Sequence, residues 1–108
     1  MMVPAFDEIF ALYARHGWIL RRLLLTRKTS SQIGETPAGI PVIESDFDAA
    51  WFSRPSQTGE YAWEIRNLGP TPFAFVEHLD DSAPEFEQRL REVQDRLRKV
   101  IASKARGH

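Results

Sequence analysis

The last third of the chain carries an apolar repeat that constrains the fold more than any other feature. Its apolar positions are four or three residues apart: Phe86, Leu90, Val93, Leu97 and Val100. This spacing aligns them along one stripe of an α-helix. Ser82 and Glu85 form the pattern of a capping box just upstream. The sequence therefore predicts a long helix over residues 83–104, buried along one stripe, with a frayed tail from about residue 104 to residue 108.

Shorter patterns upstream predict a second helix and several strands. Residues 4–16 repeat apolar side chains at helical spacing and end at Gly17, a residue that favours helix termination. Residues 18–26 are rich in large aliphatic side chains without a helical stripe, which is typical of a strand. Residues 27–41 are dense in Thr, Ser, Gly and Pro, so an irregular loop is expected there. Further short strands are predicted at residues 40–43, 49–54, 61–66 and 73–79.

This order of elements predicts an α+β fold. We expect an antiparallel, meander-like β-sheet of about four strands, bracketed by the N-terminal helix and the long C-terminal helix. The 108 residues match the usual size of a single domain, so one domain over residues 1–108 is predicted. Arg21 and Arg22 are neighbours in the first strand, and side chains alternate along a strand. One arginine is therefore expected on each face of the sheet.

Composition narrows the classes of function. The formal net charge is −1, and proteins that bind duplex nucleic acid depend on a basic excess, so nucleic acid is an unfavoured partner. The absence of cysteine excludes disulfides and thiolate metal sites. No apolar run approaches the length of a membrane span, and residues 1–10 lack the basic start of a signal peptide. We therefore expect a cytoplasmic protein with no membrane partner.

The predicted hairpin contains the densest group of candidate binding residues. Tryptophan and arginine dominate binding hot spots, and glutamate can pair with a partner's base. By alternation, Glu64 and Arg66 share one face, while Trp63 and Ile65 share the other. One interpretation places the tryptophans in the core and the charges on a solvated face. The other makes this hairpin a binding surface composed of Trp51, Arg54, Trp63, Glu64 and Arg66.

Three functions follow as hypotheses, because the sequence contains no motif of a catalytic, cofactor or metal site. The first is a non-enzymatic binding or interaction module that uses the hairpin, either to form a homodimer or to bind an unidentified protein partner. The second is a small enzyme or binder of anionic small molecules, in which Arg54 or Arg66 holds the anion and His78 or Asp48 is the base. The third is a nucleic-acid accessory protein that uses the basic residues after position 95. No cofactor is expected.

Three segments of the central region also carry a resemblance. Residues 48–55 (DAAWFSRP), 62–66 (AWEIR) and 71–74 (TPFA) resemble small uncharacterised bacterial proteins of unknown function. The resemblance implies a bacterial origin and no particular activity, substrate or catalytic residue. The order of elements differs from that of an RNA-recognition motif, which begins with a strand and has a helix between its strands.

Overall fold

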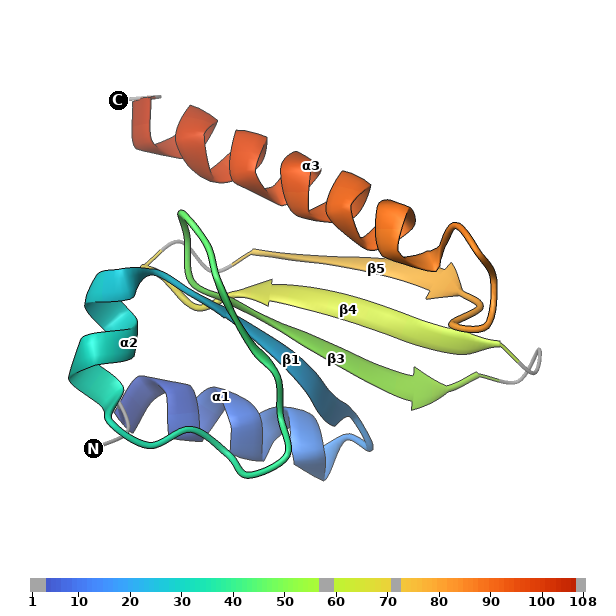
Figure 1. The fold of residues 1–108 in the computed structure, drawn as a ribbon, viewed down its shortest axis with the longest axis horizontal. Helices are drawn as coiled ribbons and strands as arrows, with labels where there is room; N and C mark the ends of the chain where they lie inside the picture. The colour runs from blue at the N-terminus through green and yellow to red at the C-terminus, as the bar shows by residue number, and fades with distance from the viewer. Residues whose placement is uncertain (1–3, 57–59, 71–72, 107–108) are drawn as a thin grey trace.

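The computed structural model describes residues 4–56, 60–70 and 73–106, which contain three helices and five strands (Figure 1). In chain order these are α1 (Pro4–Arg15), β1 (Ile19–Leu25), α2 (Arg27–Ile33), β2 (Val42–Glu44), β3 (Ala49–Pro55), β4 (Tyr61–Asn67), β5 (Ala74–Leu79) and α3 (Phe86–Arg106). No helix among these residues is long and apolar enough to cross a membrane.

The five strands form one mixed sheet in the order β2-β1-β3-β4-β5. β1 and β2 are parallel, and every other neighbouring pair is antiparallel. The helix-plus-sheet class is confirmed. The prediction of about four strands in an antiparallel-only sheet is wrong, because β2 follows a helical connection and returns parallel to β1.

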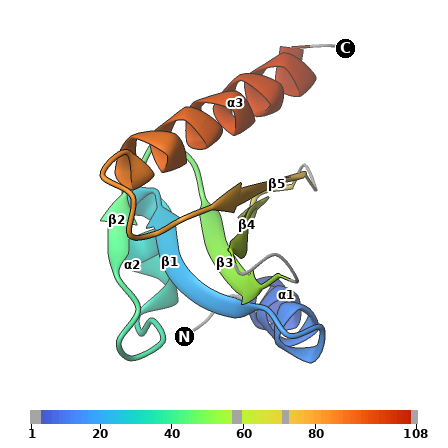
Figure 2. The same ribbon diagram turned by 90° about the vertical axis from the view of Figure 1, so that its right-hand side faces the viewer.

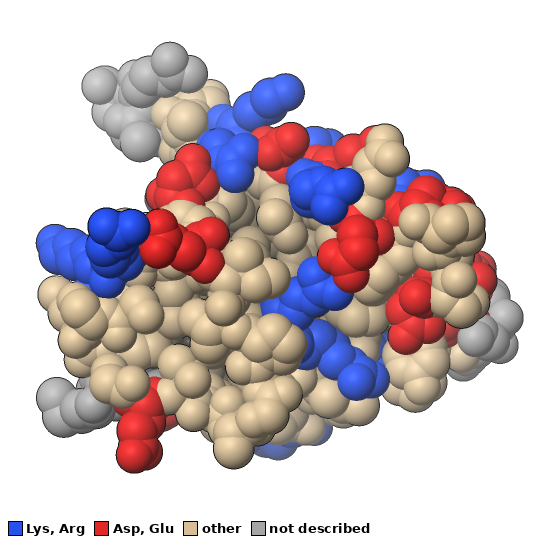
Figure 3. Space-filling model, in the orientation of Figure 1, with Lys and Arg blue, Asp and Glu red and all other residues tan. Residues whose placement is uncertain are grey.

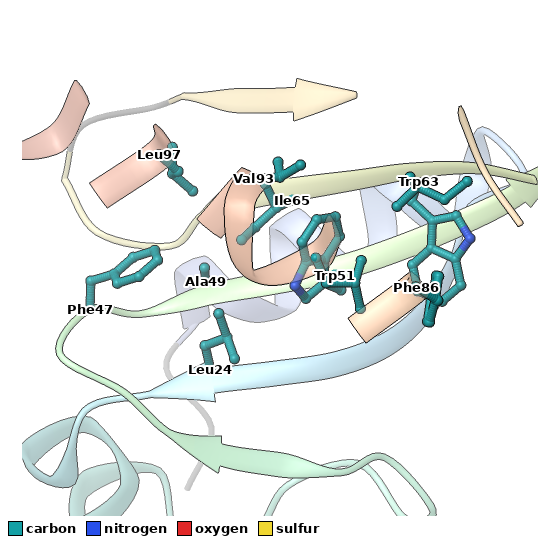
Figure 4. Packing of buried hydrophobic residues seen from close by; sticks show 11 residues of the cluster. Leu24, Phe47, Ala49, Trp51, Trp63, Ile65, Phe86, Val93 and Leu97 are labelled. Atoms are coloured by element: carbon teal, nitrogen blue, oxygen red, sulfur yellow. The ribbon is translucent and has the colours of Figure 1, made fainter. Parts of the chain in front are cut away.

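One apolar core lies between the sheet and α3, which runs across one face (Figures 1 and 2). Alternate residues of the strands meet the predicted stripe of α3 there, as the close view in Figure 4 shows. The buried members of this core are Leu24, Phe47, Ala49, Trp51, Trp63, Ile65, Leu79, Phe86, Leu90, Val93 and Leu97. The apolar stripe of α3 and the alternating apolar residues of the strands therefore pack against each other in one core.

A second core lies on the opposite face, beneath α1 and α2 (Figure 2). The rings of Tyr13 and Phe52 stack there, with centroids 4.0 Å apart. The buried members are Phe6, Leu23, Leu25, Ile33, Ala50, Phe52 and Leu68. The sheet therefore has helices on both faces, and the central strands β1 and β3 are buried from both sides.

The segment predicted to be an irregular loop begins with α2. Thr26 caps this helix, and its hydroxyl oxygen accepts from the backbone N–H of Thr29 at 3.1 Å. Asp48, distant in sequence, accepts from the backbone N–H of Thr26 at 2.8 Å and from the Thr29 hydroxyl at 2.6 Å. Ile33 is 1% exposed and anchors the last turn. The loop prediction for residues 27–41 is thus wrong over its first half, because tertiary contacts stabilise a helix that hydroxyl-rich residues do not favour alone.

The ends of α3 also differ from the prediction. The helix begins at Phe86, and the Ser82 hydroxyl donates to Asp80 Oδ1 at 2.6 Å, in a turn that precedes the helix. The predicted start at residue 83 is therefore three residues early. At the other end the helix continues through Arg106, past the predicted beginning of the tail, and residues 107–108 lie outside the described residues.

A β-bulge overturns the prediction that Arg21 and Arg22 occupy opposite faces. Leu20 pairs with Phe52 and Arg22 with Trp51, so Arg21 is an extra residue in β1. Arg21 Nε donates to Ser53 Oγ at 2.7 Å, and Ser53 lies directly opposite Trp63, on the face that α3 covers. The bulge cancels the alternation at this point, and both arginines lie on the α3 side.

Charged pairs connect α3 to the sheet. Arg22 donates to both carboxylate oxygens of Glu87, at 2.8 and 2.5 Å, and this hydrogen bonding lowers the pKa of Glu87. Arg96 pairs with Glu77 of β5 at 2.6 Å, so this pair also joins the helix to a strand. Figure 3 shows side chains of both signs gathered over α3. Such exposed pairs contribute little individually, about 0.2–1 kcal/mol, but they fix how the helix lies on the sheet.

Candidate functional site

The five predicted hairpin residues do not form one surface. Trp51 and Trp63 are 0% and 5% exposed and belong to the core beneath α3. The Trp51 indole N–H donates to Gln94 Oε1 at 3.0 Å, which ties this side chain to α3. Glu64 and Arg66 are one and three residues after Trp63, so their side chains lie on the opposite face of β4, as predicted. The candidate surface is therefore the face that carries Glu64, and it excludes both tryptophans.

On this face, Glu64 joins a cluster at the C-terminal end of α1. The Tyr13 hydroxyl donates to Glu64 Oε2, and the Arg54 guanidinium lies over the Trp18 ring, 4.6 Å from its centroid. Arg54 Nη1 also donates to the backbone oxygen of His16 at 3.1 Å. These contacts join the end of α1, the turn after it, β3 and β4. The cluster thus combines two aromatic rings with a carboxylate and a guanidinium.

The turn after α1 positions Trp18 for this cluster. Gly17 has φ +83°, a left-handed conformation that a residue with a side chain adopts only at a cost. The N–H groups of Gly17 and Trp18 donate to the oxygens of Ala14 and Tyr13, at 3.1 and 3.0 Å, so the last turn of α1 closes back on itself. This closure brings Trp18 beside Tyr13, with ring centroids 6.1 Å apart.

The cluster surrounds a surface hollow of about 250 Å³, which we call the Trp18 hollow. Its lining residues are Leu12, Tyr13, His16, Trp18 and Glu64. Sites for drug-sized molecules usually measure about 300–1,000 Å³, so this hollow suits a smaller group such as one side chain of a partner. Leu12 and the two aromatic rings supply its apolar surface, and Glu64 supplies its carboxylate.

A strip of uncovered sheet lies beside the hollow. Across β4 and β5, Ala62 is opposite His78 and Glu64 is opposite Val76. Val76 is 51% exposed and His78 is also exposed, since neither side chain faces α3. The neighbouring Glu77 points to the other face, where Arg96 binds it. The open strip therefore extends the candidate surface from the hollow toward the edge strand β5.

The residues of the enzyme hypothesis fall into two groups, Arg54 with His78 at one end of the sheet and Asp48 with Arg66 at the other, where Ala50 pairs with Arg66. Arg54, Ala62 and His78 form one row across β3, β4 and β5. Asp48 precedes the opposite end of β3, six residues from Arg54, which corresponds to about 20 Å along a strand. Its carboxylate is bound by Thr26 and Thr29 at the start of α2. Asp48 thus lies far from Arg54 and His78, and it stabilises the fold locally.

The described part of the chain contains no group of three His, Cys, Asp or Glu residues arranged to hold a metal ion. In the basic C-terminal segment, Arg96 pairs with Glu77, and Arg98 pairs with Asp46 at 3.0 Å. These contacts hold α3 to the rest of the molecule. They reduce the positive charge that the segment could offer to phosphate groups.

Burial and the neighbouring Glu64 raise the pKa of the Tyr13 hydroxyl above its ordinary value of 10.0. In the unfolded chain Tyr13 ionises near that ordinary value, so the unfolded state releases its proton first as the pH rises. The stabilising contribution of the protonated hydroxyl is therefore complete below pH 10.0 and is lost progressively above it, toward the raised folded pKa. Tyr13→Phe is expected to make stability fall less steeply as the pH rises above about pH 10.

Urea unfolding across that pH range measures this effect. Tyr61→Phe is the matched control, because Tyr61 is exposed and lies outside the hollow. Equal slopes for the Tyr13→Phe variant and the unmodified protein would show that the folded state does not hold the Tyr13 proton.

Fold and site together define an α+β protein with a mixed five-stranded sheet, helices on both faces and an aromatic, charged hollow beside an open strip. Comparisons with protein-family models, with curated proteins and with solved structures find no match to this chain. The resemblance noted in the sequence therefore stays a prediction, and the interpretation of the hollow rests on its geometry.

Proposed function

We propose that the protein is a non-enzymatic interaction module that binds a partner protein at the Trp18 hollow and the open strip beside it. The observation that carries the proposal is the combination, in one hollow, of the Trp18 and Tyr13 rings with the Glu64 carboxylate, beside the Arg54 guanidinium that lies over the Trp18 ring. Tryptophan, tyrosine and arginine are the residues that contribute most often to hot spots of protein interfaces.

The hollow selects for the chemistry of the group that enters it. Leu12, 47% exposed, and the Trp18 ring offer apolar contact. Glu64 Oε2 accepts from Tyr13, and Oε1 has no partner among the described residues. A side chain with an apolar body and one hydrogen-bond donor satisfies both features, because it buries its body and donates to Oε1. We therefore propose that an aromatic side chain of the partner, carrying an N–H or O–H, occupies the hollow.

An NMR titration with N-acetyltryptophanamide tests this function. The indole N–H signal of Trp18 is expected to shift and saturate, with a Kd on the order of 1 mM, which corresponds to about −4.1 kcal/mol for a single inserted group. The signals of Trp51 and Trp63 are expected to stay unchanged, because both side chains are buried in the core beneath α3.

Leu12→Glu is expected to weaken this binding at least tenfold, by about 1.4 kcal/mol, because it removes the apolar contact of Leu12 and puts a hydrated charge in the wall of the hollow. Ile19→Glu is the matched control: Ile19 is also 47% exposed and does not line the hollow. Both variants retain the fold if their amide spectra disperse as that of the unmodified protein does. An unmoved Trp18 signal, or equal binding by both variants, would contradict the proposal.

A further inference from the structure

The sheet has an open edge at β2, its outermost strand on that side (Figure 2). All three residues of β2 are exposed, and the apolar Val42 and Ile43 are 40% and 41% exposed. Proteins protect edge strands by keeping them very short, as β2 is with three residues, or with lysine, proline, a bulge or a covering segment. Val42 and Ile43 are instead apolar and favour strand pairing.

The hydrogen bonds to β1 show which backbone groups of β2 remain free. The Leu23 N–H donates to the Pro41 oxygen at 3.0 Å, and the Ser45 N–H donates to the Leu25 oxygen at 2.9 Å. In a parallel pair, every second residue of a strand directs its backbone groups to a given neighbour. Pro41, Ile43 and Ser45 therefore face β1. The N–H and C=O groups of Val42 and Glu44 point outward from the sheet.

We propose that a second copy of this chain pairs with this edge, β2 against β2, antiparallel about a two-fold axis at Ile43. In this register Val42 lies opposite Glu44 of the second copy, and Glu44 lies opposite its Val42. All the outward N–H and C=O groups of both residues then gain partners, and the two sheets become one. A register centred on Glu44 would place two carboxylates directly opposite each other, which is destabilising.

A second hollow beside the edge supports the same register. It measures about 370 Å³ and is lined by Leu25, Arg27, Ser30, Ser31, Val42 and Glu44. A two-fold axis perpendicular to the sheet keeps the α2 side of both copies on one face, so Val42 of the second copy enters beside Leu25 and Glu44. Arg27 Nη2 lies 3.3 Å from Glu44, so each carboxylate keeps its counter-charge when the strands meet.

This pairing does not involve the Trp18 hollow, because the hollow lies beside β4 and the strands β1 and β3 separate β4 from β2. It also differs from the dimer expected from the sequence, which used the hairpin of β3 and β4. Both strands of that hairpin are interior strands, already paired on both sides. β2 offers free backbone groups, and strand addition at an edge depends on these.

Val42→Pro tests the proposal most directly. Proline removes the outward N–H of Val42, while the bonds to β1 through Pro41 and Ser45 remain. Sedimentation velocity from about 1 μM to about 1 mM is expected to show a monomer–dimer equilibrium for the unmodified protein. The Val42→Pro protein is expected to dimerise at least tenfold more weakly than the unmodified protein. At the lowest concentration, where both proteins are monomers, their Tm values are expected to be equal.

Two further variants keep the test decisive if proline disturbs folding. Val42→Lys places a cation on the edge and is expected to prevent dimerisation, as lysine does on natural edge strands. Val76→Lys is the matched control, since Val76 is 51% exposed but lies on β5, and its dimer is expected to persist. A monomer at 1 mM, or a dimer that survives both substitutions of Val42, would overturn the proposal.

Discussion

Replacing Trp51 by alanine is expected to lower the free energy of unfolding by about 3–5 kcal/mol. The side chain is fully buried between β3 and α3, and its ring meets that of Trp63 edge-on, with centroids 6.2 Å apart. Truncation leaves a cavity. It also removes the indole N–H that donates to Gln94 Oε1 at 3.0 Å, so this oxygen loses its hydrogen bond. Urea unfolding followed by circular dichroism measures the change, with a matching decrease in Tm.

Trp51→Phe separates the two causes. Phenylalanine fills most of the space but cannot donate to Gln94, so a loss of about 1–2 kcal/mol is expected from the hydrogen bond and the smaller ring. A loss below about 1 kcal/mol for Trp51→Ala would mean that Trp51 is not part of the core. The hairpin hypothesis, in which Trp51 belongs to a binding surface, would then regain its support.

The parts of the fold that the sequence predicts are those governed by local periodicity. The stripe from Phe86 to Leu97 specifies both the helix and the face that it buries. Alternation also separates Glu64 from Trp63 correctly. Neither pattern states which face of the sheet α3 covers. The sequence alone is therefore compatible with both interpretations of the tryptophans.

The errors arise where long-range contacts override local preference. α2 consists largely of residues that favour turns, and Asp48 supports its first turn from outside the helix. The parallel pairing of β2 with β1 requires a crossover connection, and the three residues of β2 do not indicate whether the strand runs parallel or antiparallel to β1. The bulge at Arg21 leaves no trace in the sequence, because both residues at that point are arginines.

Half of the candidate site was predictable. The sequence points to Arg54 and Glu64 through their place in the hairpin, and it does not point to Tyr13 or Trp18. The bond between Tyr13 and Glu64 joins residues 51 positions apart, so it depends on how α1 lies against β4. The available signal was the presence of Tyr13 and Trp18 on either side of Gly17, since a helix stop brings such neighbours together.

Asp48→Ala is expected to lower the free energy of unfolding by about 1–3 kcal/mol. The substitution removes the acceptor for the Thr26 N–H and for the Thr29 hydroxyl, which lie at the N-terminal end of α2. α2 carries Ile33, which packs in the second core, so loosening its first turn also weakens that packing. Urea unfolding measures the loss, and hydrogen exchange is expected to accelerate first in α2.

Asp48→Asn provides the discriminating comparison. An amide oxygen can replace one of the two acceptors, so about half of the loss is expected to be recovered. If Asp48 served as a catalytic base instead, alanine and asparagine would be equally harmful to activity and both would leave stability nearly unchanged. A graded loss of stability, largest for alanine, therefore assigns Asp48 to the support of α2. It would also remove one of the two bases on which the enzyme hypothesis depends.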